Sequence, residues 1–418
     1  MEKNGAANRG SKAVTRAVAA VLTVAFLGLI VTAFGSMLLN DGKDIVKSVR
    51  LMKNLKAYLP EKWNQLDLLS ARISSFTSKI SEVMWKKSEM GCVNSAFQYA
   101  LGKKVVNTGA QNMIRLNTGH FYDFMEYKDL TPNAEGIIEL RNTTLKDVPF
   151  LFVYEHPTLY DPDNMMPAEY APLDHSAQMA AEALDVLHAG GIETLDSRDV
   201  LNGSGVPLNE LLMVTDQHWS TKAAILMAKA TLLKINEQTG ANLDASALDF
   251  SRFDTITYEK RFLGKYGQRV GTGVVEPDDL VEYVPKDDVF IICETLHRNS
   301  TVPDRTEGSF PEAVVRRDRL ERDEGKTYNL LGYTYYGQVE TYRNFTNPTA
   351  PDFTILMLKD SYSAPMAPFL ALAAREVISV DMRQDVDPLE TWVEKYQPDV
   401  VVMAYSLQML RDDEYKFG

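Results

Sequence analysis

The segment Thr215 to Ser220 contains the residue types and the spacing of a general base with an orienting acid. It reads Thr-Asp-Gln-His-Trp-Ser, so Asp216 and His218 stand two residues apart, just before a predicted helix. At this spacing in a turn, Asp216 can hold one ring nitrogen of His218 while the other remains available. A histidine suits proton transfer because its ordinary pKa lies near neutrality. The competing interpretation is that Asp216 and Ser220 only cap the helix and His218 is a packed polar residue.

A base of this kind needs a nucleophile, and two serines follow a predicted strand near residue 358. If Ser361 capped the next helix, Pro368 would stand seven residues into it, whereas a Ser363 cap puts Pro365 in the permissive first turn. Ser363 is therefore the predicted cap. Ser361 is left in the turn at the strand end, where backbone amides and the helix dipole can stabilise an oxyanion. The spacing predicts a Ser361–His218–Asp216 triad; the alternative is two capped helix starts in an unrelated fold.

The elements that must position these residues alternate between strands and helices. Such alternation predicts a mostly parallel sheet covered on both faces, with ligands at the carboxyl ends of the strands. Residues 255–345 lack long helical periodicity, so we expect loops and peripheral strands there that shape a cleft. The loop at Glu155-His156-Pro157 is expected to carry a surface histidine, with a cleft-bordering position as the alternative. The predicted strands are 148–154, 192–195, 353–358, 377–381 and 400–405, and the predicted helices are 176–188, 221–238, 364–375 and 389–396.

The N-terminal region predicts attachment to a membrane. Residues 17–39 contain no charged side chain, and 23 residues are enough to span a bilayer as a helix. Four basic residues and one acidic residue precede this run, so the positive-inside rule makes residues 1–16 a cytoplasmic tail and places the rest outside the cytoplasm. A cleaved signal peptide is the rival interpretation. Residues 41–90 are predicted to form a membrane-proximal helical spacer, with a coiled-coil or partner-binding role as the alternative.

Composition excludes several classes of protein. With 418 residues and 45% hydrophobic side chains, the chain can fill the core of one large domain. Subtracting the net charge of +3 in residues 1–40 from the total of −13 leaves −16 for the rest, which argues against a nucleic-acid partner. No cysteine and histidine cluster has metal-ligand spacing, so we expect no metal site. Cys92 and Cys293 can pair or remain two buried thiols.

The segments that contain Asp216, His218 and Ser361 resemble those of a known family. Asp216-Gln217-His218-Trp219 is similar to the DHHW motif, and residues 359–363 resemble the serine block of the SGNH-hydrolase-like proteins related to alginate O-acetyltransferases. Residues 262–271, with Asp278-Asp279 after them, resemble the middle segment of that family, so the likeness covers residues 145–410. Gln217 replaces the first histidine of the motif, at a position not assigned to catalysis. The Asp-x-His pair precedes the serine, as in the acetyltransferase-like branch.

The resemblance implies a three-layer αβα SGNH-hydrolase-like domain over residues 91–418, preceded by the single transmembrane helix. It implies Ser361 as nucleophile, His218 as base and Asp216 as orienting acid. Arg269 and Asn344 are candidates for substrate or oxyanion binding, with a structural role as the alternative. The implied activity is transfer of acetyl groups, without a cofactor, to a cell-surface or exopolysaccharide, with a membrane-bound O-acyltransferase delivering the acetyl group. Two alternatives remain: a carbohydrate acetylesterase with the same triad, and a non-catalytic glycan-binding scaffold.

Overall fold

The computed structural model describes residues 87–107, 112–156, 161, 165–298, 300–320, 335–337, 339–384 and 386–411. The predicted cytoplasmic tail (1–16) and transmembrane anchor (17–39) lie outside these ranges, as do all but the last four residues of the predicted spacer (41–90). Within the described ranges, no helix has both the length and the apolar character needed to cross a bilayer. The residues from Cys92 to Gly418 form one compact unit.

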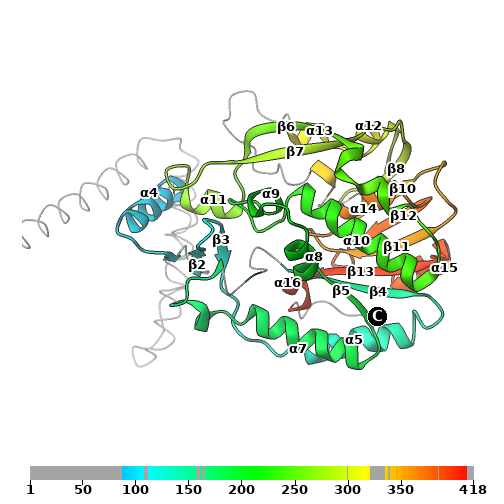
Figure 1. The fold of residues 1–418 in the computed structure, drawn as a ribbon, viewed down its shortest axis with the longest axis horizontal. Coiled ribbons are helices and arrows are strands. Elements are labelled where there is room, and N and C mark those ends of the chain that lie inside the picture. Colours follow the sequence, from blue (N-terminus) through cyan, green and yellow to red (C-terminus); the bar gives the residue numbers. More distant parts are fainter. Residues whose placement is uncertain are drawn as a thin grey trace, which may run out of the picture. The chain divides into compact units, whose positions relative to one another are not determined.

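The central sheet has eight strands in the order β5-β4-β13-β11-β12-β10-β8-β9 (Figure 1). The first five strands of this order run parallel to one another, and β11 lies between β13 and β12. Ser361 therefore follows a strand in the interior of the sheet, at its carboxyl end. The bounds of these five strands are β4 (Phe150–Glu155), β5 (Glu193–Asp196), β11 (Thr354–Lys359), β12 (Glu376–Val380) and β13 (Val400–Ser406).

The interior strands are almost entirely apolar because both faces of the sheet are covered. Along β11, Ile355 and Met357 pack into one hydrophobic core, while Leu356 and Leu358 pack into a second core on the opposite face. This alternation follows from the two-residue period of a strand. Figure 1 shows α5 and α7 along one side of the central strands and α10 on the other. The sheet and its two helical layers form the predicted α/β architecture.

The helices divide between the two cores according to their buried side chains. Those in the first core are α8 (Ser197–Gly203), α9 (Leu208–Leu211), α10 (Thr221–Thr239), α12 (Phe310–Val314), α13 (Arg317–Leu320) and α14 (Met366–Leu370). Those in the second core are α5 (Thr131–Asn142), α7 (Ser176–Ala189), α15 (Leu389–Tyr396) and α16 (Leu407–Leu410).

The sheet continues beyond β12 with three antiparallel strands, in a region where the sequence predicted only loops and peripheral strands. They are β8 (Phe290–Leu296), β9 (Asp304–Ser309) and β10 (Tyr342–Thr346). The sheet is therefore mixed, and the predicted parallel pairing holds for β5 to β12 only. The expectation of loops and peripheral strands over 255–345 was wrong for β8 and β10, because each has a strand on both sides.

Local sequence signals predicted the bounds of most helices and strands to within two residues of the observed bounds. Helix α10 begins after Ser220, whose side chain accepts a hydrogen bond from the Ala223 amide, and ends at Gly240 with a φ of 72°. The helix predicted over 364–375 was wrong in extent. It is the five-residue helix α14, and Pro365 precedes it where Ser363 was the expected cap. Cys92 and Cys293 form no disulfide; Cys293 is buried in the first core.

Two small sheets lie beside the carboxyl edge of the central sheet. One contains β1 (Val105–Asn107), β2 (Asn112–Arg115) and β3 (Phe121–Asp123), and the other is the hairpin of β6 (Phe253–Phe262) and β7 (Asp278–Pro285). Helix α11 (Lys265–Val270) follows β6, and its buried residues pack with β2 and β3 in a third cluster. Helix α4 (Lys87–Ala100) adds Tyr99 to that cluster.

Candidate active site

The structure brings together the three residues predicted to form a triad. Nδ1 of His218 lies 2.5 Å from Oδ1 of Asp216, and Nε2 of His218 lies 3.0 Å from Oγ of Ser361. Asp216 and His218 are buried, and Ser361 is half-buried at the carboxyl end of β11. With the proton on Nδ1 held by Asp216, Nε2 accepts the proton of the serine hydroxyl. This is the geometry of an activated serine nucleophile.

The loop that carries Asp216 is fixed by residues that follow it by about fifty positions. Asp278 accepts hydrogen bonds from the Val214 amide (2.8 Å) and from both the amide and the hydroxyl of Thr215 (2.8 and 2.5 Å). The Thr215 hydroxyl accepts a hydrogen bond from the Gly264 amide (2.8 Å), and the Thr215 carbonyl accepts one from the Tyr266 amide (2.9 Å). Burial raises the pKa of Asp278 to about 6, against the effect of these bonds.

Asp216 keeps its negative charge despite being almost fully buried. Burial raises the pKa of this carboxyl, but the neighbouring His218 ring and the amides of Lys265 and His218 outweigh burial and lower the pKa below its usual value. The Lys265 amide donates to Oδ2 at 2.8 Å, so Oδ1 faces the imidazole. A charged Asp216 holds the ring in one tautomer and stabilises the imidazolium that forms when His218 takes a proton.

The turn after β11 is built around the side chain of Asp360. Its Oδ1 accepts hydrogen bonds from the amides of Tyr362 (2.7 Å) and Ser363 (3.2 Å), and its Oδ2 accepts one from the Ser406 amide (3.0 Å). Ser363 does not cap α14. Its hydroxyl donates to the Ala404 carbonyl at 2.9 Å, which ties the turn to β13. Asp360 engages the two amides after Ser361, whereas the Ser361 amide remains available to donate to a substrate oxygen.

Trp219 and Tyr362 join the base loop to the nucleophile turn. The indole Nε1 of Trp219 donates to the Tyr362 carbonyl at 2.8 Å, and the Tyr362 ring centroid lies 4.7 Å from that of His218. Both side chains are buried. This hydrogen bond and this ring contact tie the segment that carries His218 to the segment that carries Ser361, which holds the imidazole beside the hydroxyl. Trp219 had no predicted role beyond its place in the motif.

Glu155 lies beneath the nucleophile turn, at the start of the loop that was expected to carry a surface histidine. It ends β4 opposite Ser406, and its carboxyl is fully buried against Asp360. Neither oxygen accepts a hydrogen bond from a described N–H or O–H group. Burial and the negative charge of Asp360 raise the pKa of Glu155 well above its usual value. The Glu155 carboxyl therefore favours its neutral form, since two buried carboxylates in contact repel each other strongly. His156 is also buried, so the expected surface histidine was wrong.

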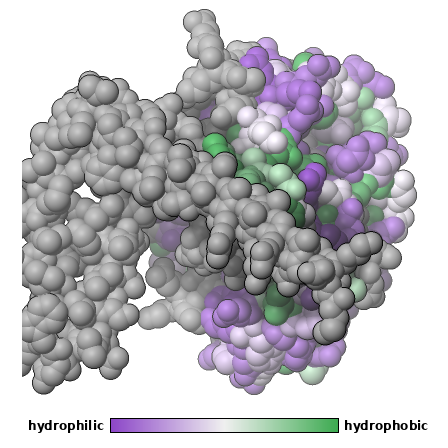
Figure 2. All heavy atoms as spheres, turned by 90° about the vertical axis from the view of Figure 1, so that its left-hand side faces the viewer, coloured by the Kyte–Doolittle hydropathy of each residue, from purple (hydrophilic) through white to green (hydrophobic). Residues whose placement is uncertain are grey.

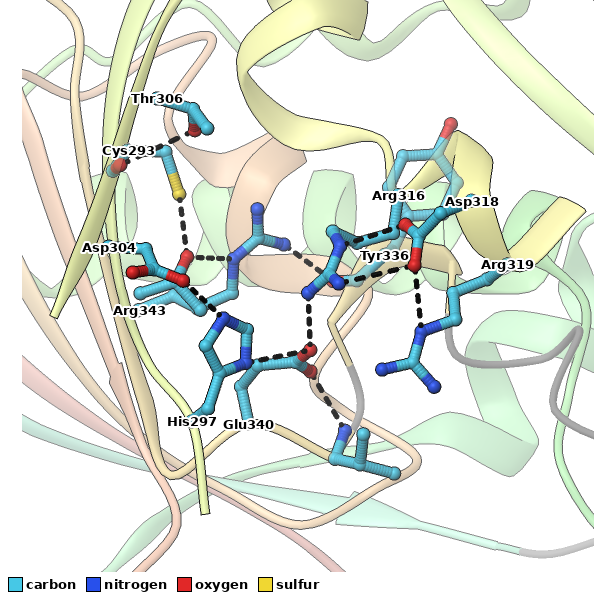
Figure 3. Close-up of polar contacts among 12 residues, drawn as sticks. Cys293, His297, Asp304, Thr306, Arg316, Asp318, Arg319, Tyr336, Glu340 and Arg343 are labelled. Carbon is cyan, nitrogen blue, oxygen red and sulfur yellow. Dashed lines mark hydrogen bonds and ion pairs between the residues drawn. The ribbon is translucent and has the colours of Figure 1, made fainter. Parts of the chain in front are cut away.

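A polar network around the buried Glu340 contacts the end of β11 through Lys359 (Figure 3). Figure 3 shows the buried Glu340 between His297 and Arg316. Nη1 of Arg316 donates to Oε1 of Glu340 at 3.1 Å, and Nδ1 of His297 lies 3.7 Å from the same oxygen. The backbone carbonyl of Glu340 accepts a hydrogen bond from Nζ of the buried Lys359 at 2.8 Å. Because Lys359 directly precedes the nucleophile turn, the network fixes where that turn begins.

The two weaker site candidates lie in different places. Arg269, on α11, is bound through Nη1 to both carboxylate oxygens of Asp123 at 3.1 Å, and Asp123 lines a cavity beside the triad. Asn344 lies in the middle of β10, where its amide donates to Glu376 at 2.8 Å. The structure does not bring Asn344 to the triad, because β12 separates β10 from β11. Its predicted role in substrate or oxyanion binding was therefore wrong.

A cavity of about 380 Å³ opens beside the triad. Its walls include Gln217 and Tyr362, the neighbours of His218 and Ser361, together with Lys265 and Arg411. A larger cavity of about 650 Å³ lies along the β6–β7 hairpin. None of the three triad residues lines either cavity, but only the smaller one is lined by Gln217 and Tyr362, which directly adjoin His218 and Ser361, so we assign the smaller cavity to the site. Figure 2 views the molecule from the side toward which the parallel strands end, and its coloured part shows hydrophilic residues above and below a smaller hydrophobic area.

Comparison with solved structures identifies the fold. A DHHW family protein from Eubacterium siraeum matches with a TM-score of 0.58 at 14% identity, over 75% of this chain and 97% of the other. Bacillus cereus PatB1 with a sulfonyl adduct matches with a TM-score of 0.59 at 15% identity, over 74% of this chain and 99% of the other. The chain has the fold of a DHHW family protein. The resemblance seen in the motifs is confirmed at the level of the fold.

Other comparisons add little to this result. The O-acetyltransferase domain of Pseudomonas putida AlgJ matches with a TM-score of 0.37 at 13% identity, over 71% of this chain and 91% of the other. No family model matches the sequence, and no curated protein matches it either.

Gly264 tests whether the α11 segment positions the acid. A Cβ at residue 264 would lie 2.3 Å from the Asp216 Cβ and 2.4 Å from its Oδ2, although the φ of −69° suits any residue. We expect Gly264→Ala to displace Asp216 and to lower the kcat of the reaction that Ser361 begins by about 100-fold, because small misplacements of catalytic groups slow a reaction strongly. Gly273→Ala is the matched control, since a Cβ there meets nothing within 4 Å. Equal kcat values for the two variants would contradict the assignment.

Glu155→Gln tests the raised pKa of Glu155 through the pH dependence of stability. Because the pKa of Glu155 is raised in the folded protein, its contribution to stability is complete below the ordinary Glu pKa and is lost as pH rises toward the raised value. The amide of glutamine can donate to Asp360 at every pH. As pH rises above about 4.5, the free energy of unfolding of the wild type should fall relative to that of the variant, by up to about 1.4 kcal/mol per pH unit until Glu155 is ionised in the folded protein. Denaturant unfolding at several pH values measures this, and parallel curves would contradict a raised pKa of Glu155.

Proposed function

We propose that this domain is an extracytoplasmic O-acetyltransferase that modifies hydroxyl groups of a polysaccharide through an acetyl-serine intermediate. The observation that carries the proposal is the position of His218, which contacts Asp216 through one nitrogen and Ser361 through the other, beside an open cavity. The fold shared with a DHHW family protein and the matching serine block support acetyl transfer as the chemistry.

The reaction proceeds in two steps that use the same base. Nε2 of His218 takes the proton of Ser361 while Oγ attacks the carbonyl carbon of the acetyl donor. The Ser361 amide donates to the oxyanion, and His218 returns the proton to the leaving group of the donor. An acceptor hydroxyl then loses its proton to His218 and attacks the acetyl-serine, and His218 finally reprotonates Ser361. Asp216 holds the tautomer throughout and stabilises the imidazolium.

The acceptor and the donor are the remaining parts of the proposal. A sugar hydroxyl can reach the acetyl-serine through the cavity formed by the neighbours of Ser361 and His218. The family resemblance supports a polysaccharide as acceptor and a membrane-bound O-acyltransferase as the source of the acetyl group. If water attacks the acetyl-serine, the same residues act as an esterase; if the serine is never acetylated, the domain serves as a glycan-binding scaffold.

Kinetics on point variants test the roles of the triad. With an activated acetyl ester as donor and an oligosaccharide as acceptor, Ser361→Ala should abolish transfer and Asp216→Asn should lower kcat by about 10⁴-fold, because the imidazole would lose its correct tautomer. Ser251→Ala, on an exposed serine, is the control and should retain wild-type rates. Undiminished transfer by Ser361→Ala would contradict the mechanism. Release of acetate without acetylated sugar would favour the esterase.

The proposed location follows from the sequence of residues 1–40. The uncharged run at 17–39 and the basic residues before it support a single-pass anchor with the N-terminus in the cytoplasm and the domain outside it. In intact cells with a permeabilised outer layer, an added protease should degrade the domain from residue 92 onward, while a tag fused at residue 1 should remain protected. Protection of the domain under these conditions would place it in the cytoplasm.

A further inference from the structure

Helix α4 has one face bound to the domain and an opposite face that carries apolar side chains. On the bound face, the hydroxyl of Ser95 donates to the Arg269 carbonyl at 3.3 Å, and the Tyr99 ring packs edge-on against Phe121 with ring centroids 6.1 Å apart. Figure 1 shows α4 next to α11, the helix that carries Arg269. Because the first amide of α11 also donates to Asp216, α4 is attached to the active-site scaffold.

Three large apolar side chains form a stripe on the opposite face, which we call the α4 stripe. Val93, Phe97 and Leu101 are spaced by four residues, and 63%, 52% and 63% of their surfaces are exposed. Leu101 continues the helix by one residue, since its amide donates to the Phe97 carbonyl at 3.1 Å. Side chains four residues apart lie along one line of a helix. Each of the other described helices carries at most one exposed large apolar side chain, so the α4 stripe is unusual within this domain.

Basic side chains lie at the end of the α4 stripe. Lys103 and Lys104 follow the helix directly, and Arg115 lies beside Lys104, because the Arg115 amide donates to the Lys104 carbonyl at 3.0 Å. All three side chains are exposed. Glu169 lies 3.6 Å from Lys104, but an ion pair this exposed contributes little. Residues 92–122 contain no acidic side chain, in a chain with a net charge of −13. This surface is therefore both apolar and locally positive.

The charges around the α4 stripe distinguish between three possible partners, which are lipid, the segment before α4 and a second copy of the chain. Residues 41–86 contain nine basic and five acidic side chains, so they would bring positive charge to a positive surface. A second copy related by a twofold axis would bring its own Lys103 and Lys104 to the same place. An anionic lipid surface is complementary in both respects, because its headgroups are negative and its acyl chains are apolar.

We propose that the α4 stripe and the three basic residues at its end dock the domain on an anionic lipid surface. The stripe enters the boundary between headgroups and acyl chains, and the basic side chains contact the headgroup phosphates. The uncharged run at 17–39, proposed above as an anchor, gives the reason that a membrane lies near α4. The inference concerns how the domain is held against the membrane, and it does not depend on acetyl transfer.

Photolabelling from within the bilayer tests the docking. The full chain is reconstituted in phosphatidylcholine vesicles, with or without phosphatidylglycerol, that contain a phospholipid with a diazirine in its acyl chain. After illumination, the tryptic peptide of residues 88–103 should carry a lipid adduct. The adduct yield should be about 10-fold or more lower without phosphatidylglycerol or in high salt, because the basic residues then lose their partners. Equal yields with and without the anionic lipid would overturn the proposal, as would an unlabelled peptide.

Variants on the exposed face locate the contact. Phe97→Gln should lower the adduct yield by about 10-fold or more, because it removes the apolar side chain at the centre of the stripe. Lys104→Gln combined with Arg115→Gln should lower the yield by a similar factor on anionic vesicles only, and it retains the tryptic site at Lys103. Leu233→Gln is the matched control, since Leu233 is an exposed apolar side chain on α10.

The outcome for these variants decides the assignment. All of them should unfold at the wild-type temperature, because the replaced side chains are exposed. Leu233→Gln should keep the wild-type adduct yield. A yield that Phe97→Gln leaves unchanged, or that Phe97→Gln and Leu233→Gln lower equally, would contradict docking through the α4 stripe.

The same preparation separates docking from the proposed anchor. Flotation of the vesicles in high salt reports the anchor, whereas the adduct on residues 88–103 reports docking. Protein that floats in high salt but remains unlabelled on anionic vesicles at low salt would retain the anchor and reject the docking surface. Protein that is labelled at low salt but leaves the vesicles in high salt would do the reverse. Neither measurement uses catalysis, so a failure of acetyl transfer would leave both results unchanged.

Discussion

The hydrogen bond between Asp216 and His218 is the interaction on which the rest of the site depends. An imidazole reaches a serine in the correct tautomer only if its other nitrogen is held, and an almost fully buried carboxylate holds it only if its own charge is balanced. Here the Lys265 amide and the His218 amide both donate to Asp216. The first donor belongs to α11 and the second to the loop that carries His218, so α11 is part of the active-site scaffold.

Two buried carboxyl groups near the nucleophile have opposite charge states. Asp216 is surrounded by N–H donors and has a lowered pKa, whereas Glu155 faces Asp360 without a described donor and has a raised pKa. Asp360, which faces Glu155, receives three backbone hydrogen bonds. The environment thus keeps an ionised acid behind the base and a neutral acid beneath the nucleophile turn.

Sequence reasoning succeeded where the signals were local. Apolar runs predicted β11 and β13, and Ser220 and Gly240 predicted both ends of α10. The prediction that Ser361 and His218 lie together followed from the rule that loops at the carboxyl ends of parallel strands meet at one edge of the sheet. The family resemblance named the same residues independently.

The features that were missed depend on contacts between distant segments. Nothing in the sequence near Tyr342 indicates that β10 pairs with both β8 and β12, and nothing near Glu155 indicates that Asp360 faces it. Ser363 has the local character of a helix cap, but its hydroxyl bonds to β13 instead. For Gly264 there was a signal, since it lies in the segment that resembles the family, but its role required the position of Asp216.

The central claim is that His218 activates Ser361 to accept an acetyl group, and mass spectrometry of the trapped intermediate tests it most directly. The protein is mixed with an activated acetyl ester, quenched in acid within the first turnover, and digested. The account predicts one acetyl group on Ser361 in the wild type and much slower acetylation of Ser361 in His218→Ala. An unmodified Ser361, or acetylation that proceeds equally fast without His218, would contradict it.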